Sequence, residues 1–103
     1  MKIIMEGLRY DTDTAEEVAS YNNGYCPADF NYIYRTLYRT ERGNWFCVNK
    51  GGANTAYAES YGDSRSEGTR VEPMGDPDAY DLLEQWGATD ALEKYFSGEI
   101  EDA

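Results

Sequence analysis

Residues 30–39 show the clearest alternation of side-chain character in the chain. One set of alternate positions carries Phe30, Tyr32, Tyr34, Thr36 and Tyr38, and the other carries Ile33, Arg35, Leu37 and Arg39. This period of two predicts a β-strand, because successive side chains of a strand point to opposite faces. The turn sequence at 41–44 and the apolar run at 45–48 predict a second strand, antiparallel to the first.

Two further regions have the composition of strands. The β-prone runs 2–5 and 8–10 flank Glu6-Gly7, a pair that suits a tight hairpin turn. Residues 69–74 predict a short strand at the edge of a sheet, because Pro73 cannot donate a backbone hydrogen bond.

Three other segments have helix or loop signals. Asp13 and Glu16 have capping-box spacing, and the apolar residues that follow recur at helical intervals, so a helix is predicted over residues 13–22. After the glycine pair that ends the central hairpin, residues 53–61 favour a short helix. Residues 62–68 favour a polar, mobile loop.

The acidic C-terminal region predicts two short helices. Asp76-Pro77 suggests an N-cap followed by proline at the first helical position, and Gly87 ends that helix. Thr89 is the expected cap of a second helix that ends at Gly98. The apolar positions expected to be buried are Leu82, Leu83, Trp86, Leu92 and Phe96.

These elements predict an α+β fold. Residues 1–103 form one small domain, a mostly antiparallel sheet with helices packed on one face. Its acidic helical part spans 76–98, and the tail 99–103 is expected to fray. With 41% hydrophobic and 15% aromatic residues, the chain differs in composition from disordered chains of similar charge. No apolar stretch approaches the roughly 18 to 20 residues that span a bilayer, so a soluble protein of the bacterial cytoplasm, without membrane contact, is expected.

The charge is concentrated in the last third of the chain. Residues 72–103 contain ten of the 20 acids and only one of the nine bases, in a chain of net charge −11. A nucleic-acid backbone would be repelled by this region, since each phosphate contact needs a cation. A basic protein surface is the expected partner, and direct binding of nucleic acid is not expected.

The composition gives little indication of catalytic activity. The chain contains no histidine, which removes the usual general base and the usual zinc ligand. Its two cysteines, Cys26 and Cys47, do not form a metal-binding spacing, and no phosphate-binding or nucleophile motif is present. No enzyme activity, metal or cofactor is therefore expected.

Two surfaces remain as candidates for binding. The acids of the C-terminal helices fall opposite their apolar arcs; they serve either a partner or solubility. The bases Arg35, Arg39, Arg42 and Lys50 of the central hairpin either form a second surface or pair with the helices. Asp78, Asp81 and Glu84 are like charges three residues apart, an arrangement that destabilises a helix by a few tenths of a kcal/mol per pair.

Several segments resemble a known family. They are Tyr10-Asp11-Thr12-x-Thr14-Ala15, Leu37-Tyr38-Arg39-Thr40-x-x-Gly43-Asn44-Trp45-Phe46, Gly51-Gly52, Tyr57-Ala58-Glu59-Ser60 and Ala91-Leu92-Glu93-Lys94-Tyr95-Phe96. In these the chain resembles small acidic proteins carried on plasmids, conjugative elements and prophages of Gram-positive bacteria. The resemblance covers most of the chain. Because many anti-CRISPR inhibitors are small acidic proteins of such elements, it implies an anti-CRISPR function.

The expected function is therefore inhibition by occupancy. The protein would bind the basic nucleic-acid channel of a CRISPR effector nuclease and block the loading of guide or target. The expected partner-binding residues are Asp78, Asp81, Glu84, Asp90 and Glu93, with Tyr80 and Tyr34 as aromatic anchors. The alternatives are an accessory protein of a mobile element, such as an antitoxin-like partner of a basic protein, and a small hydrolase-like enzyme.

Overall fold

A computed structural model describes all residues, 1–103, as eight strands followed by two helices. The strands are β1 (Lys2–Met5), β2 (Leu8–Asp11), β3 (Glu16–Asn22), β4 (Ile33–Arg39), β5 (Trp45–Gly51), β6 (Glu59–Tyr61), β7 (Ser64–Ser66) and β8 (Gly68–Met74). The helices are α1 (Asp76–Gln85) and α2 (Thr89–Phe96), and a 3₁₀ turn covers Ser97–Glu99. The molecule is elongated, with extents of 50 × 35 × 20 Å. The expected α+β class with antiparallel sheets is confirmed.

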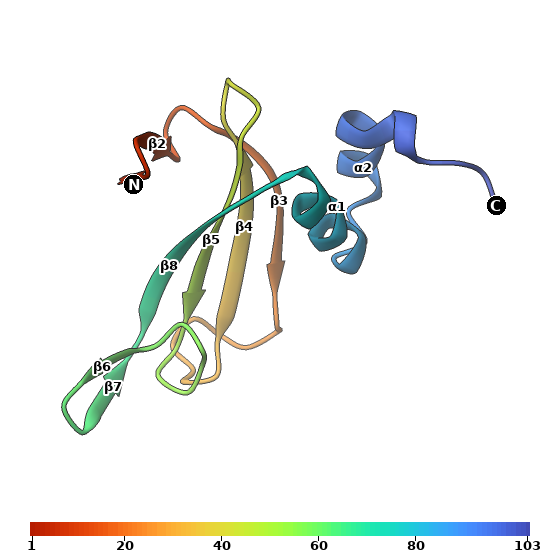
Figure 1. Ribbon diagram of the computed structural model, residues 1–103. Helices are drawn as coiled ribbons and strands as arrows, with labels where there is room; N and C mark the ends of the chain where they lie inside the picture. Colours follow the sequence, from red (N-terminus) through yellow and green to blue (C-terminus); the bar gives the residue numbers. More distant parts are fainter.

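The main sheet has four strands in the order β3-β4-β5-β8, all antiparallel (Figure 1). The expected central hairpin is present: β4 and β5 pair along their whole length, from Ile33 with Gly51 to Arg39 with Trp45. The strand at 69–74 is confirmed as the edge strand β8, where Pro73 lies opposite Phe46.

Both helices pack on one face of this sheet, as expected (Figure 1). Alternation brings the odd positions of β4 and β5 to this face, where Leu37, Trp45 and Cys47 are buried. They form one core with Leu83 of α1 and Phe96 of α2. The main core therefore lies between the sheet and the acidic helices, so it fixes the positions of their outer faces.

The opposite face of the sheet is covered only in part. The expected opening hairpin is confirmed: β1 and β2 pair around a turn in which Glu6 and Gly7 have φ of 50° and 78°. Its Tyr10 packs edge-on against Phe46 at a ring distance of 5.3 Å, and Val48 completes this second, smaller core.

The helix predicted over residues 13–22 is wrong, because most of this segment is strand β3. The residues that suggested a helix cap form a single turn instead, in which the Ala15 amide donates a hydrogen bond to the Asp11 carbonyl. A β-bulge then interrupts the pairing of β3 with β4 beside Val18. Both Val18 and Ala19 consequently contact the main core, while Ala15 contacts the second core, and their spacing imitates a helix.

The short helix predicted at 53–61 and the loop predicted at 62–68 are also wrong. Thr55 forms a tight turn whose hydroxyl donates to the Gly52 carbonyl, and the chain then enters a second hairpin, β6 and β7. The turn packs tightly against the rest of the fold at glycine positions: a Cβ on Gly52 would collide with the Asp29 and Phe30 carbonyl groups, and a Cβ on Gly68 would collide with the Tyr57 carbonyl. Tertiary packing on glycine therefore overrides the local helix preference of the alanines.

The two C-terminal helices occur where they were predicted, with each cap one residue earlier. Gly75 and Ala88 occupy the N-cap positions, and neither Asp76 nor Thr89 makes a side-chain cap. The Asp76 carboxylate instead accepts a hydrogen bond of 2.7 Å from the Trp45 indole N–H. Gly87 has φ of 66° and ends α1 as expected.

Burial of the predicted apolar positions is confirmed for three of five. Leu82, Leu83 and Phe96 are buried, whereas Trp86 and Leu92 are half-buried. Trp86 lies at the margin of the core, stacked on the exposed ring of Tyr21 at 6.0 Å.

Candidate protein-binding site

The first part of the candidate site is a cavity between α1 and the edge strand β8. It has a volume of about 340 Å³ and is lined by Asp78 and Asp81 of α1 and by Glu72 of β8. The turn at Gly75 directs α1 back across the sheet, and helical spacing places the two aspartates on the side that faces β8. Three carboxylates from two elements therefore meet at this cavity.

A single cation lies in the same cavity. The Arg35 side chain is 20% exposed and lies 3.9 Å from the Glu72 carboxylate. Its Nε–H donates to the Asn49 side chain at 2.6 Å, and its guanidinium lies 5.6 Å from the centre of the Trp86 ring. These contacts hold Arg35 against the sheet, so Asp78 and Asp81 remain without an ionic partner.

The second part of the site surrounds Tyr80. Its half-buried ring packs edge-on against the buried Phe96 of α2 at 5.3 Å, so the side chain is held at the contact between the two helices. Loss of hydration raises the pKa of the Tyr80 phenol, and the neighbouring carboxylates of Glu84, Glu99 and Asp81 raise it further. The phenol therefore remains a neutral hydrogen-bond donor among several negative charges.

The acids of α2 form a third part. Asp90 and Glu93 are exposed and make no ion pair. Lys94, the only base of the C-terminal third, is bound to Glu16 of β3 at 2.9 Å and so neutralises none of the helix acids.

Helix stability does not explain the charge on α1. The acids of its first turn, Asp76 and Asp78, suit the positive end of the helix dipole. Glu84, however, lies in the last turn, where the dipole disfavours an anion, and no base is present there. The distribution of acids along α1 is therefore that of an exposed negative surface.

The predicted site residues do not form one surface. On α1, Asp78 and Asp81 line the cavity beside β8, whereas Glu84 and Tyr80 lie close to each other on another side of the helix. Asp90 and Glu93 lie on the neighbouring helix α2. Tyr34 lies on the other face of the sheet, because it alternates with the helix-facing Arg35. The sequence analysis did not include two further acids of the site, Glu72 and Glu99. Alternation along β8 indicates that Glu72 faces the helices, whereas no sequence pattern indicates a role for Glu99.

The four bases of the central hairpin are also separated. Arg35 and Arg39 face the helices, in line with the interpretation that these bases pair with the helices. Arg39, however, contacts aromatic rings instead of carboxylates: its guanidinium lies 4.7 Å from the ring centre of Trp45 and 5.2 Å from that of Tyr95. Lys50 points to the opposite face, and Arg42 lies in the exposed turn. They do not form a shared basic surface.

Alkylation provides a test of the two thiols. Cys47 is fully buried, and its burial raises its pKa from 9.0 to about 11, so almost no thiolate forms near neutral pH. Iodoacetamide at about pH 8 is expected to modify the exposed Cys26 and to leave Cys47 unmodified until the protein unfolds. Mass spectrometry counts the adducts; two adducts on the folded protein would contradict this expectation.

The raised pKa of Cys47 also affects stability. The thiol form of Cys47 stabilises the fold below pH 9, and this contribution is lost as the pH rises through about 11.

The structure has no helix with the length and apolar character needed to cross a membrane. Nor does it contain a group of three or more cysteine and acidic side chains arranged to hold a metal ion. Comparisons with protein-family models, with curated proteins and with solved structures give no match.

Proposed function

We propose that this protein is an inhibitor of the anti-CRISPR type. It binds the basic nucleic-acid channel of a bacterial CRISPR effector nuclease and blocks the loading of guide or target, without catalysis. The observation that supports this most is the α1 surface: Asp78, Asp81 and Glu84 are exposed, lie on a helix fixed by the core, and lack ionic partners.

Charge spacing is consistent with such a partner. Residues three apart on a helix are separated by about 4.5 Å along its axis, so these carboxylates offer regular negative points to side chains that otherwise bind phosphates. Association would be fast, because opposite charges steer the encounter. The resemblance to acidic proteins of mobile elements supports the identity of the partner as a host defence nuclease.

A rigid scaffold favours this mode of binding. α1 is held by Leu83 in the main core, and the Trp45–Asp76 hydrogen bond fixes its first turn. The carboxylates are therefore ordered before the partner arrives, which reduces the entropic cost of association.

Binding to a purified effector nuclease at low and high salt provides the test. The affinity of the wild-type protein is expected to fall steeply as salt rises, because exposed charges are screened beyond about 8 Å at physiological ionic strength. DNA cleavage should be inhibited over the same range of protein concentration. Affinity that is indifferent to salt, or tight binding without inhibition, would contradict the proposal; capture of a basic toxin instead would favour the antitoxin-like alternative.

A further inference from the structure

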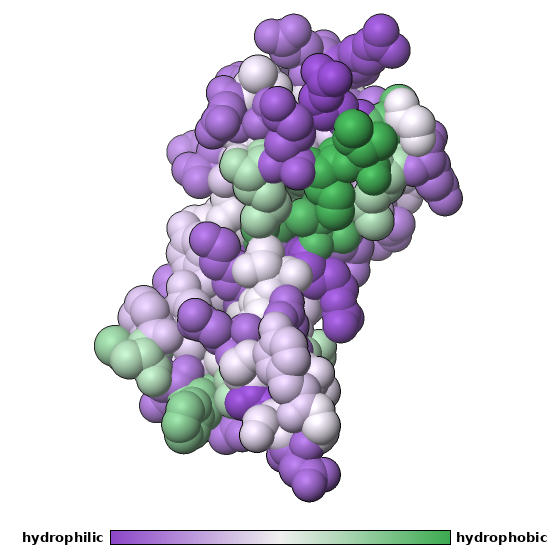
Figure 2. All heavy atoms as spheres, turned by 90° about the vertical axis from the view of Figure 1, so that its left-hand side faces the viewer, coloured by the Kyte–Doolittle hydropathy of each residue, from purple (hydrophilic) through white to green (hydrophobic).

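A groove remains on the sheet face opposite the helices. The β1–β2 hairpin covers the end of this face that carries Phe46. Beyond that end, backbone pairing aligns Asn22, Tyr34, Lys50 and Thr69 in one row across β3, β4, β5 and β8. Figure 2 looks onto this face and shows the green, apolar surface of the hairpin above a paler band that continues toward the lower end of the molecule.

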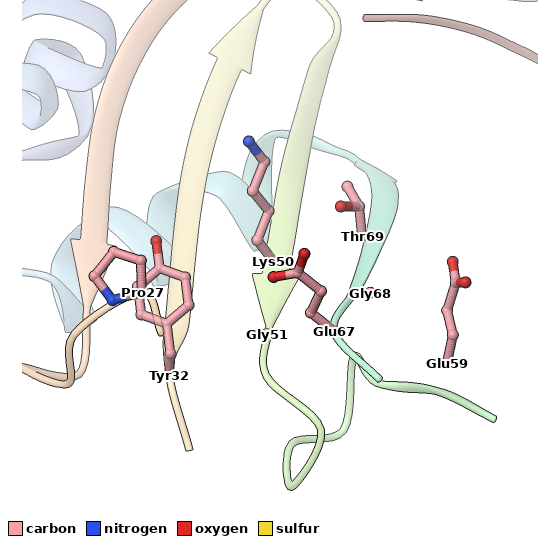
Figure 3. Close-up of a pocket in the computed structure, with 8 residues that line it drawn as sticks. All are labelled: Pro27, Tyr32, Lys50, Gly51, Glu59, Glu67, Gly68 and Thr69. Carbon is pink, nitrogen blue, oxygen red and sulfur yellow. The ribbon is translucent and has the colours of Figure 1, made fainter. Parts of the chain in front are cut away.

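Two adjacent cavities lie along this row, and Lys50 lines both. The larger, about 450 Å³, is bordered by Tyr32 on one side and by Glu59 and Glu67 of the β6–β7 region on the other. Their side chains extend in the same direction as that of Lys50 (Figure 3). The smaller cavity, about 260 Å³, lies beside Tyr34. The two together provide room for several residues of an extended chain.

The larger cavity contains more negative than positive charge. The Glu67 carboxylate makes no ion pair, and that of Glu59 accepts only the Tyr61 hydroxyl, at 2.6 Å. Lys50 is exposed and likewise forms no ion pair. Two carboxylates and one ammonium group are thus available to a ligand.

Aromatic rings line the same groove. Tyr32 and Tyr34 are stacked, with ring centres 6.4 Å apart and planes within 15°. Such rings attract a guanidinium or ammonium group placed over their faces.

We propose that this groove binds an extended segment of a partner protein, with a lysine or arginine side chain of that segment in the larger cavity. Glu59 and Glu67 would accept charge-assisted hydrogen bonds from that cation, while Lys50 would donate to a peptide carbonyl. An anionic ligand would meet two carboxylates for one lysine on a chain of net charge −11. The same repulsion disfavours a second copy of this chain.

The test is an NMR titration of the isotope-labelled full-length protein with a capped Gly-Arg-Gly-Arg-Gly peptide. The largest changes in chemical shift are expected for the backbone amides around Tyr34, Lys50 and Thr69. The double substitution E59Q with E67Q should weaken binding at least about fivefold, since it removes two charge-assisted contacts. A Gly-Glu-Gly-Glu-Gly peptide and a short oligothymidylate should produce no shifts in this region.

A matched control separates the groove from general attraction to an acidic protein. The substitutions E41Q with E101Q remove the same charge from exposed positions outside both the groove and the α1 surface, and should change the affinity less than about twofold. Equal weakening by both pairs, shifts centred on the helices, or binding of the acidic peptide or oligonucleotide in the groove would overturn the proposal. It is independent of the proposed inhibitor function, which concerns the opposite face.

Discussion

Replacement of Trp45 by alanine is expected to lower the free energy of unfolding by about 3 to 5 kcal/mol, the usual cost of removing a large buried aromatic side chain. Trp45 is 1% exposed, is stacked on Phe96 at 5.6 Å and contacts Tyr95 edge-on at 5.3 Å. Its indole also donates to Asp76, so one side chain links the sheet to both helices. A small domain has roughly 5 to 15 kcal/mol of stability, and much of it would be lost.

Thermal and urea unfolding measure this effect, with W86A as the control. Trp86 is half-buried, so its removal should cost clearly less than that of Trp45. The variant W45F, which keeps a ring but loses the N–H donor, should lie between them at about 1 to 3 kcal/mol. A melting temperature of W45A within about 2 °C of wild type would show that the helices do not depend on this residue.

Reversal of Asp78, Asp81 and Glu84 to lysine is expected to reduce affinity for the proposed effector by at least about a hundredfold, or about 2.7 kcal/mol. Each substitution changes the net charge by two units at a position that forms no ion pair within the protein. The fold should persist, because exposed helix substitutions of this kind usually change stability by less than about 0.5 kcal/mol each.

The control for this variant reverses the same number of charges elsewhere. Asp13, Glu41 and Asp63 are exposed and form no ion pair, and their reversal to lysine gives the same net charge. This control should retain most of the wild-type affinity at physiological salt. If both variants bind equally well, the acids of α1 serve solubility; if both lose binding equally, net charge matters and the α1 surface does not.

The sequence predicted those parts of the fold in which local pattern and tertiary packing agree. The central hairpin has alternation on its first strand and an apolar run on its second, and the C-terminal helices have proline and glycine at their ends. The sequence-based prediction failed at β3, because a bulge brings both Val18 and Ala19 to the same face of the sheet, and the resulting pattern imitates helical spacing. It also failed at the Gly52–Ala58 turn, where contacts with glycine backbone from distant residues determine the conformation.

The candidate site could be predicted only in part, for a related reason. Helical periodicity identifies the outer positions of α1 and α2, and the structure places their acids in solvent. Periodicity cannot show which strand lies beside a helix, so the position of Glu72 across the cavity from Asp78 was not predicted. Nor does it show which face of a sheet the helices cover, which is why Tyr34 was grouped with residues on the opposite side.

Competition with guide RNA shows whether inhibition occurs by occupancy of the nucleic-acid channel. The anisotropy of a fluorescently labelled guide reports its binding to the purified effector nuclease, and wild-type protein is added either before or after the guide is loaded. Protein added first is expected to prevent guide or target from binding, whereas the variant with Asp78, Asp81 and Glu84 reversed is not. Formation of a ternary complex that retains guide and target at full affinity would show that the protein does not occupy the channel.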